Sequence, residues 1–134
     1  MLIFWYLFKK LLMEFFINKG ATLPVLKMQV VKDGIADITE FMSLIENSLI
    51  YFSMIDVKTG GYKILNKKGG FVEKTFVDPN AETEYYVYYK FTSSDTSREG
   101  LYEGEFVFIT DTGTYILPIR EKLTIKIGNS YVSI

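Results

Sequence analysis

Residues 84–109 read EYYVYYKFTSSDTSREGLYEGEFVFI and contain two alternating segments joined by a polar loop. Side chains of a β-strand point to its two faces in turn, so every second residue of such a segment lies on the same face. In the first segment, one face holds Tyr85, Val87, Tyr89 and Phe91. The other face holds Tyr86, Tyr88 and Lys90, so we expect a strand over Glu84–Phe91 with both faces covered.

The second segment, Leu101–Ile109, continues the same period of two. One of its faces holds four residues: Tyr102, Gly104, Phe106 and Phe108. The loop between the segments, Thr92–Gly100, is rich in Ser, Thr and charged residues. Residues 84–109 therefore predict a strand, a polar loop and a second strand.

Short alternating runs continue toward both ends of the chain. They predict further strands at Val25–Lys32, Ser48–Val57, Tyr62–Asn66, Phe71–Phe76, Thr114–Ile119 and Leu123–Ile127. Turn signals separate several of these runs: Asp33-Gly34, Thr59-Gly60-Gly61 and Asp111-Thr112-Gly113. Pro118 indicates a sheet edge or a bulge, because proline has no amide hydrogen to donate.

Residues 67–70, Lys-Lys-Gly-Gly, stand between two of the predicted strands. A glycine pair between two strands is typical of a β-hairpin, so Tyr62–Asn66 and Phe71–Phe76 are predicted to pair as its arms. Lys67 and Lys68 would then keep the turn soluble. The Gly-x4-Gly-Lys-Ser/Thr spacing of a phosphate-binding loop is absent at this position.

The number and spacing of the runs indicate the fold class. About seven or eight short strands between Leu23 and Ile134 predict an all-β, immunoglobulin-like two-sheet β-sandwich. One short inserted helix is predicted over Ile38–Glu46, because Asp37 and Glu40 have the spacing of a capping box. A length of 134 residues suits one such domain, over residues 21–134, after an apolar docking segment over residues 1–20.

The N-terminal segment is apolar up to Asn18, apart from Lys9, Lys10 and Glu14. If it is a helix ended by Gly20, its apolar residues form a stripe along one side. This stripe and the neighbouring tryptophan make up the predicted interface: Phe4, Trp5, Phe8, Leu11 and Phe15. Because one small sandwich cannot cover such a helix entirely, we expect the segment to dock against other proteins.

Three other interpretations of residues 1–18 stay open at this point. A membrane span would need roughly 20 apolar residues, whereas the longest uncharged run is Met1–Phe8. A secretion signal would place its charges before the apolar run and would end at small residues, and neither feature is present. Translation could also start downstream, at Met13 or Met28.

The amino-acid composition argues against several classes of function. The chain has no Cys and no His, which removes disulfides, thiol nucleophiles, the usual zinc sites and an imidazole base. Its 15 Lys and Arg residues nearly balance 16 Asp and Glu residues, so no net positive charge attracts nucleic acid. We therefore expect a non-enzymatic protein with no cofactor, metal site, small-molecule substrate, membrane partner or nucleic-acid partner.

Residues Thr92–Phe106 contain the pattern Asp-Thr, a short spacer, Gly, any residue, Tyr, three residues and Phe. This pattern resembles the immunoglobulin-like N-terminal domain of tailed-phage baseplate upper proteins. Ile50–Asp56 is similar to the family's early core strand, Gly60-Gly61 to the turn that follows it, and Asp111–Pro118 to its final hairpin. In that family the polar loop closes the sandwich and Gly-x-Tyr opens a late strand.

The resemblance spans about Leu26 to Ile127. It implies a bacteriophage virion structural protein of the tail, baseplate or neck, assembled in the host cytoplasm, with no enzymatic activity. Its partners would be other virion structural proteins and copies of itself. The sequence departs from the family in its apolar N-terminal segment, in its inserted Asp37–Glu46 helix and in lacking a long C-terminal extension, so the position in the virion stays open.

A carbohydrate- or peptide-binding module is the alternative function, carried by Tyr85, Tyr86, Tyr88 and Tyr89. Three exposed, coplanar tyrosines in a groove would favour it, whereas burial between two sheets would remove it. More often such a run forms strand core and cross-strand pairs. The acidic residues Asp95, Glu99, Glu103 and Glu105 lack calcium-loop spacing and predict a solvated edge, with no cleft for a glycosidase pair.

Overall fold

The computed structural model describes residues 13–29, 48–74, 84–118 and 122–129. Within these residues the chain is all-β, with no helix, and its nine strands form one sheet of six strands and one of three. The helix predicted over Ile38–Glu46 lies outside the described residues, as do residues 1–12 of the N-terminal segment.

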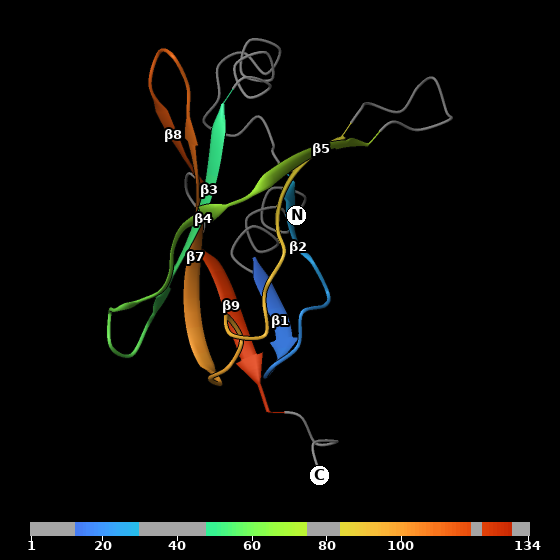
Figure 1. Cartoon of the computed structure of the whole chain (residues 1–134), viewed down its shortest axis with the longest axis vertical. Helices are drawn as coiled ribbons and strands as arrows, with labels where there is room; N and C mark the ends of the chain where they lie inside the picture. The colour runs from blue at the N-terminus through green and yellow to red at the C-terminus, as the bar shows by residue number, and fades with distance from the viewer. Residues whose placement is uncertain (1–12, 30–47, 75–83, 119–121, 130–134) are drawn as a thin grey trace, which may run out of the picture.

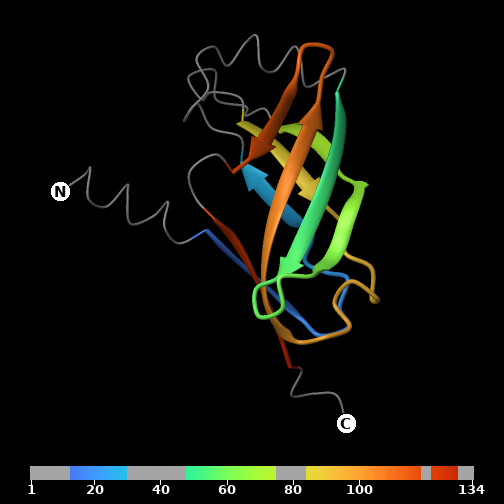
Figure 2. The same cartoon turned by 90° about the vertical axis from the view of Figure 1, so that its left-hand side faces the viewer.

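The six-stranded sheet is built around β7 (Gly100–Ile109). One edge of β7 pairs with β3 (Leu49–Asp56). The other edge pairs with two strands, first with β9 (Leu123–Gly128) and then, nearer the end of β7, with β8 (Thr114–Leu117). All three strands are antiparallel to β7. Beyond β3 lies β4 (Tyr62–Lys68), and beyond β9 lies β1 (Glu14–Asn18). Figure 2 looks onto the outer face of this sheet.

The three-stranded sheet has β6 (Glu84–Tyr89) at its centre. Its antiparallel neighbours are β2 (Leu26–Gln29) and β5 (Gly70–Lys74). In Figure 1, β3, β7 and β8 lie to the left and β2 and β5 to the right, so the two sheets form two layers. Each strand predicted from the period of two corresponds to one of β2 to β9, with ends that differ by a few residues.

Buried side chains from both sheets meet in one core. The predicted inward face of β7 is confirmed, since Tyr102, Gly104, Phe106 and Phe108 are all buried. The ring of Phe52 on β3 stacks on the ring of Tyr89 on β6, with 4.7 Å between the ring centroids. A Cβ at Gly104 would lie 2.9 Å from that Phe52 ring, so the glycine leaves the space that the ring occupies.

The predicted hairpin at Lys67–Gly70 is wrong. β4 pairs with β3 in the six-stranded sheet, whereas β5 pairs with β6 in the other sheet, so the chain crosses from one sheet to the other between them (Figure 1). The Gly69 amide still donates to the Ile50 carbonyl oxygen at 2.9 Å, so no turn begins there. A Cβ at Gly70 would lie 2.3 Å from the Tyr88 ring, which shows why glycine suits this close crossing.

The predicted N-terminal helix is wrong over Glu14–Asn18, which forms the strand β1. This strand runs parallel to β9, with Phe15 opposite Ile125 and Ile17 opposite Ile127. The burial alternates with the period of a strand, since Ile17 is buried while Phe16 is exposed. Pairing with the edge of β9 gives these residues backbone hydrogen-bond partners and buries one face of the strand against the core. These two gains outweigh the helical spacing of the apolar residues.

Candidate interaction surface

Five of the apolar side chains that point away from the core on the six-stranded sheet lie close together. They lie on β3, β7 and β8 and form what we call the outer patch: Leu49, Tyr51, Val107, Ile109 and Ile116. Leu49 is opposite Ile109 in the register, and Val107 is opposite both Tyr51 and Ile116. The Cβ atoms of such opposite residues lie about 4.5–5.5 Å apart, so the five side chains form one continuous surface.

The outer patch is accessible to solvent. Leu49 is 57% exposed, Ile116 50% and Ile109 44%, while Tyr51 and Val107 are half-buried. No other described element lies over this face of the sheet (Figure 2). Single exposed apolar residues are common on proteins, whereas a contiguous group of them is a candidate interaction surface.

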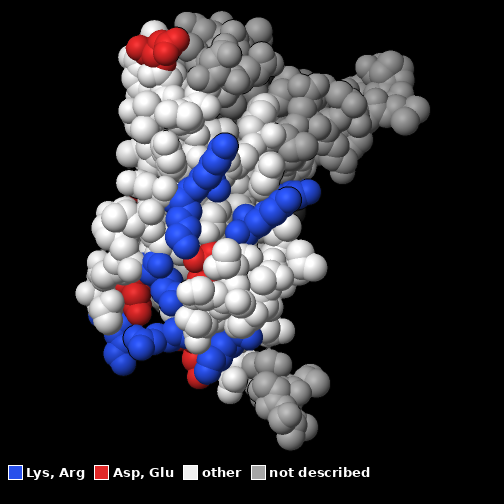
Figure 3. Space-filling model, viewed as in Figure 1, with Lys and Arg blue, Asp and Glu red and all other residues white. Residues whose placement is uncertain are grey.

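Charged residues border the outer patch on two strands. Lys68 on β4 is opposite Tyr51, and Glu105 on β7 is opposite Ser53. Within the described ranges neither Lys68 nor Glu105 takes part in an ion pair. Figure 3 shows that basic side chains gather over the middle and lower parts of the molecule, while the upper part beside β8 carries an acidic group at its tip and is uncharged below it.

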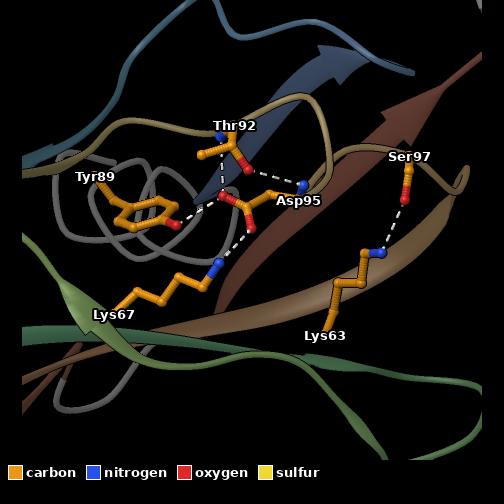
Figure 4. A network of polar contacts seen from close by, with 6 residues as sticks. All are labelled: Lys63, Lys67, Tyr89, Thr92, Asp95 and Ser97. Atoms are coloured by element: carbon orange, nitrogen blue, oxygen red, sulfur yellow. Dashed lines mark hydrogen bonds and ion pairs between the residues drawn. The ribbon is translucent and has the colours of Figure 1, made fainter.

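A polar network around the buried Asp95 joins the two sheets at another place (Figure 4). Asp95, in the loop between β6 and β7, is only 3% exposed. Its Oδ2 accepts hydrogen bonds from the Tyr89 hydroxyl at 2.7 Å and from the Thr92 amide at 2.9 Å. Its Oδ1 lies 3.4 Å from the Lys67 Nζ of β4, so one carboxylate links β4, β6 and the loop.

The electrostatics of this group keep Asp95 charged. Burial alone raises the pKa of Asp95, but the hydrogen bonds from Thr92 and Tyr89 and the charge of Lys67 outweigh it, so the pKa lies below its ordinary value. Burial also raises the pKa of Tyr89, and its hydrogen bond to the Asp95 carboxylate adds to the rise. The pair is therefore a carboxylate and a neutral phenol at neutral pH, which suits a structural link.

The prediction of a solvated acidic edge is wrong for Asp95. Thr92 and Asp95 have capping-box spacing, and they exchange two hydrogen bonds: the Thr92 amide donates to Asp95 Oδ2, and the Asp95 amide donates to Thr92 Oγ1 at 3.2 Å. This exchange turns the carboxylate inward. Of the other three acidic residues, Glu99 and Glu105 are exposed, and the half-buried Glu103 lies 3.7 Å from Lys122.

Further hydrogen bonds tie the same loop to neighbouring segments. The buried Thr96 donates from Oγ1 to the Ala21 carbonyl oxygen at 2.8 Å, and its own carbonyl oxygen accepts from the Gly20 amide at 2.8 Å. The Lys63 Nζ donates to Ser97 Oγ at 2.9 Å (Figure 4). The loop between β6 and β7 is thereby fixed to β4 and to the connection between β1 and β2.

The residues predicted as an N-terminal interface fall largely outside the described part of the chain. Phe4, Trp5, Phe8 and Leu11 lie there. Phe15 lies on β1, is half-buried, and stacks on Phe91 with 5.9 Å between the ring centroids. This ring therefore packs against the core of its own chain.

The four tyrosines predicted as a ligand face do not lie together on one surface. Tyr89 is buried in the core. Tyr86 and Tyr88 are half-buried on the opposite side, where the Lys90 Nζ lies 5.9 Å from the centroid of the Tyr88 ring. At most two of these tyrosines are thus available on one face.

Sequence reasoning missed both groups of residues that organise this structure. The outer patch has a signal in the sequence, because Val107 and Ile109 are apolar although Phe106 and Phe108 already fill the inward face of β7. The link through Asp95 also has a signal, in the spacing of Thr92 and Asp95. Neither signal says which strands lie beside β7 or which residues surround the loop.

Comparison with protein-family models, curated proteins and solved structures finds no significant match. Among the residues that the structure describes, no group of three or more acidic, His or Cys side chains is placed to hold a metal ion. Nor do the described ranges contain a helix that is long and apolar enough to cross a membrane.

Proposed function

We propose that the chain is an immunoglobulin-like β-sandwich that serves as a non-enzymatic structural protein of a tailed-phage virion, in the tail, baseplate or neck. It assembles in the host cytoplasm through contacts with other virion proteins and with copies of itself. The outer patch is the observation that carries the assembly part of this proposal. It is a continuous apolar surface on a rigid sheet, and an isolated copy leaves it in water.

The strand order supports the immunoglobulin-like part of the proposal. In immunoglobulin domains the strands G, F and C are neighbours in one sheet, variable-type domains add C′ beside C, and B, E and D lie in the other sheet. The orders β9-β7-β3-β4 and β2-β6-β5 fit these two sets. The Tyr102 hydroxyl also donates to the Arg98 carbonyl oxygen at 2.8 Å, as a tyrosine does at the corner before strand F in such domains.

The phage assignment rests on the resemblance at Thr92–Phe106. Two features of the structure support this assignment. Gly100 begins β7, with Tyr102 two residues later, and Asp95 and Thr96 are buried where the loop joins the two sheets. No observation favours the carbohydrate- or peptide-binding alternative, because Tyr89 lies in the core.

The proposal is tested on particles produced from the genome that encodes the chain. Mass spectrometry of purified particles should detect the chain at a constant ratio to the tail proteins. A chain that is expressed but missing from the particles would contradict the proposed function.

A variant should connect incorporation to the outer patch. Ile116→Lys places a charge on an exposed position of the patch, so we expect a folded chain whose incorporation into particles falls at least about tenfold. Val57→Glu is the control, because Val57 is 42% exposed in the turn that follows β3, away from the outer patch. Equal incorporation of both variants would show that assembly does not depend on the outer patch.

A further inference from the structure

We infer that the partner of the outer patch is a second copy of this chain, docked face to face about a twofold axis that runs along β3. This inference rests on the proposed function, because it names the partner for the surface through which the chain is proposed to assemble. The charges that border the patch favour this partner.

Lys68 and Glu105 lie on opposite sides of β3 on the outer face. Lys68 is opposite Tyr51 on the β4 side, and Glu105 is opposite Ser53 on the β7 side. In the sheet they are two strand spacings apart, about 10 Å, and one two-residue step, about 7 Å, along the strands. Both side chains leave the same face of the sheet and so point the same way, which together with this separation is consistent with the lack of an ion pair between them within one copy.

A twofold axis along β3 brings Lys68 of one copy to the same side of the interface as Glu105 of the other copy. It places β4 of one copy over β7 of the other, so that Lys68 faces Val107 of the second copy. Glu105 of that copy is then displaced by one two-residue step, about 7 Å along the strands, and by the distance between packed sheets, about 10 Å. Extended Lys and Glu side chains that point toward each other across the interface can span this separation. The symmetry repeats the contact, so two Lys68–Glu105 ion pairs flank the centre of the interface.

The apolar residues fit the same arrangement. Leu49 and Tyr51 lie on β3 itself, so each faces its own symmetry mate across the axis. Val107 lies next to this centre and Ile116 lies on the rim, where it is 50% exposed in a single copy. The contact thus has an apolar centre and a charged border, the usual distribution in protein interfaces.

The size of the face indicates a weak dimer. β3 and β7 pair over eight residues, which gives a length of about 27 Å. The four strands from β4 to β8 give a width of about 15–20 Å. A face of this size is at the lower end of specific interfaces, so we expect a dissociation constant in the micromolar range, roughly 1–100 µM.

Sedimentation equilibrium of the full chain over a range of concentrations tests the inference. The chain should show a monomer–dimer equilibrium. Lys68→Glu and Glu105→Lys should each weaken the dimer by roughly tenfold or more, because each places like charges opposite one another. The double variant K68E/E105K should restore the dimer to within about threefold of the original, since the ion pairs re-form with exchanged signs.

Lys58→Glu and Glu99→Lys are the matched controls, because both residues are exposed at the opposite end of the sheet. They should leave the dimer unchanged. A chain that stays monomeric at high micromolar concentration would overturn the inference. A dimer that the single reversals do not weaken, or that the double variant does not restore, would overturn it as well.

The outcomes separate this inference from the proposed function. A monomeric chain whose Ile116→Lys variant still fails to enter particles would mean that another virion protein covers the outer patch, and only the homodimer would be lost. If the chain forms the charge-dependent dimer but is absent from particles, the inferred homodimer stands and the proposed virion role is contradicted.

Discussion

Asp95 illustrates how a small protein buries a charged carboxylate. Burial alone disfavours the charged form and would raise the pKa. Hydrogen bonds from Thr92 and Tyr89, together with the nearby Lys67 ammonium, outweigh this effect and lower the pKa. Folding therefore favours the deprotonated carboxyl. The resulting stability is present above the ordinary pKa of 3.8 and is lost as the pH falls through the lower pKa of the folded state.

We expect Asp95→Asn to lower the free energy of unfolding by about 1–3 kcal/mol at pH 7, because it removes a buried charged acceptor from its donors. The difference from the original chain should narrow as the pH is lowered from 7 to about 2, since acid protonates Asp95 in the original chain. Urea denaturation across that range measures both effects. Asp111→Asn, at an exposed turn, is the control. A difference that stays constant with pH would contradict the role given to the Asp95 charge.

The strands differ in how clearly the sequence marks them. The sequence predicts four strands most clearly: β2, β3, β6 and β7. In each of them inward and outward residues alternate, and turn residues stand at the ends of the alternating runs. β1 could not be predicted, because a nearly continuous apolar run has no period that separates a strand from a helix. The crossing from β4 to β5 could not be predicted either. A glycine pair suits both a hairpin turn and a close approach between sheets, and only the neighbouring Tyr88 distinguishes them.

The strand assignment of β1 predicts which of its residues matter. Ile17→Ala should lower the free energy of unfolding by about 2–4 kcal/mol, because Ile17 is buried against the core from the edge strand. Phe16→Ala should cost less than about 1 kcal/mol, since Phe16 is exposed on the other face and contacts Lys126. Urea denaturation of both variants measures this contrast. A larger loss for Phe16→Ala than for Ile17→Ala would contradict the strand register.

For the molecule as a whole, the two-layer all-β fold could be predicted from the sequence, whereas the interaction surface could not. The outer patch combines residues from β3, β7 and β8, so it exists only once the strand order is known. Some residues that were predicted to bind a partner or a ligand pack inside the fold instead, as Phe15 and Tyr89 show. The proposed assembly surface therefore follows from the strand order as well as from the apolar residues.

The proposed function requires that a partner covers the outer face of the six-stranded sheet in the assembled state. The chain has no Cys, so Ile116→Cys places a single thiol on the outer patch. The rate of maleimide labelling at this thiol should be high in the dilute isolated chain and at least about tenfold lower in purified particles. Thr112→Cys, at the exposed turn between β7 and β8, should label at similar rates in both. Equal labelling of Ile116→Cys in the isolated chain and in the particles would contradict the proposal.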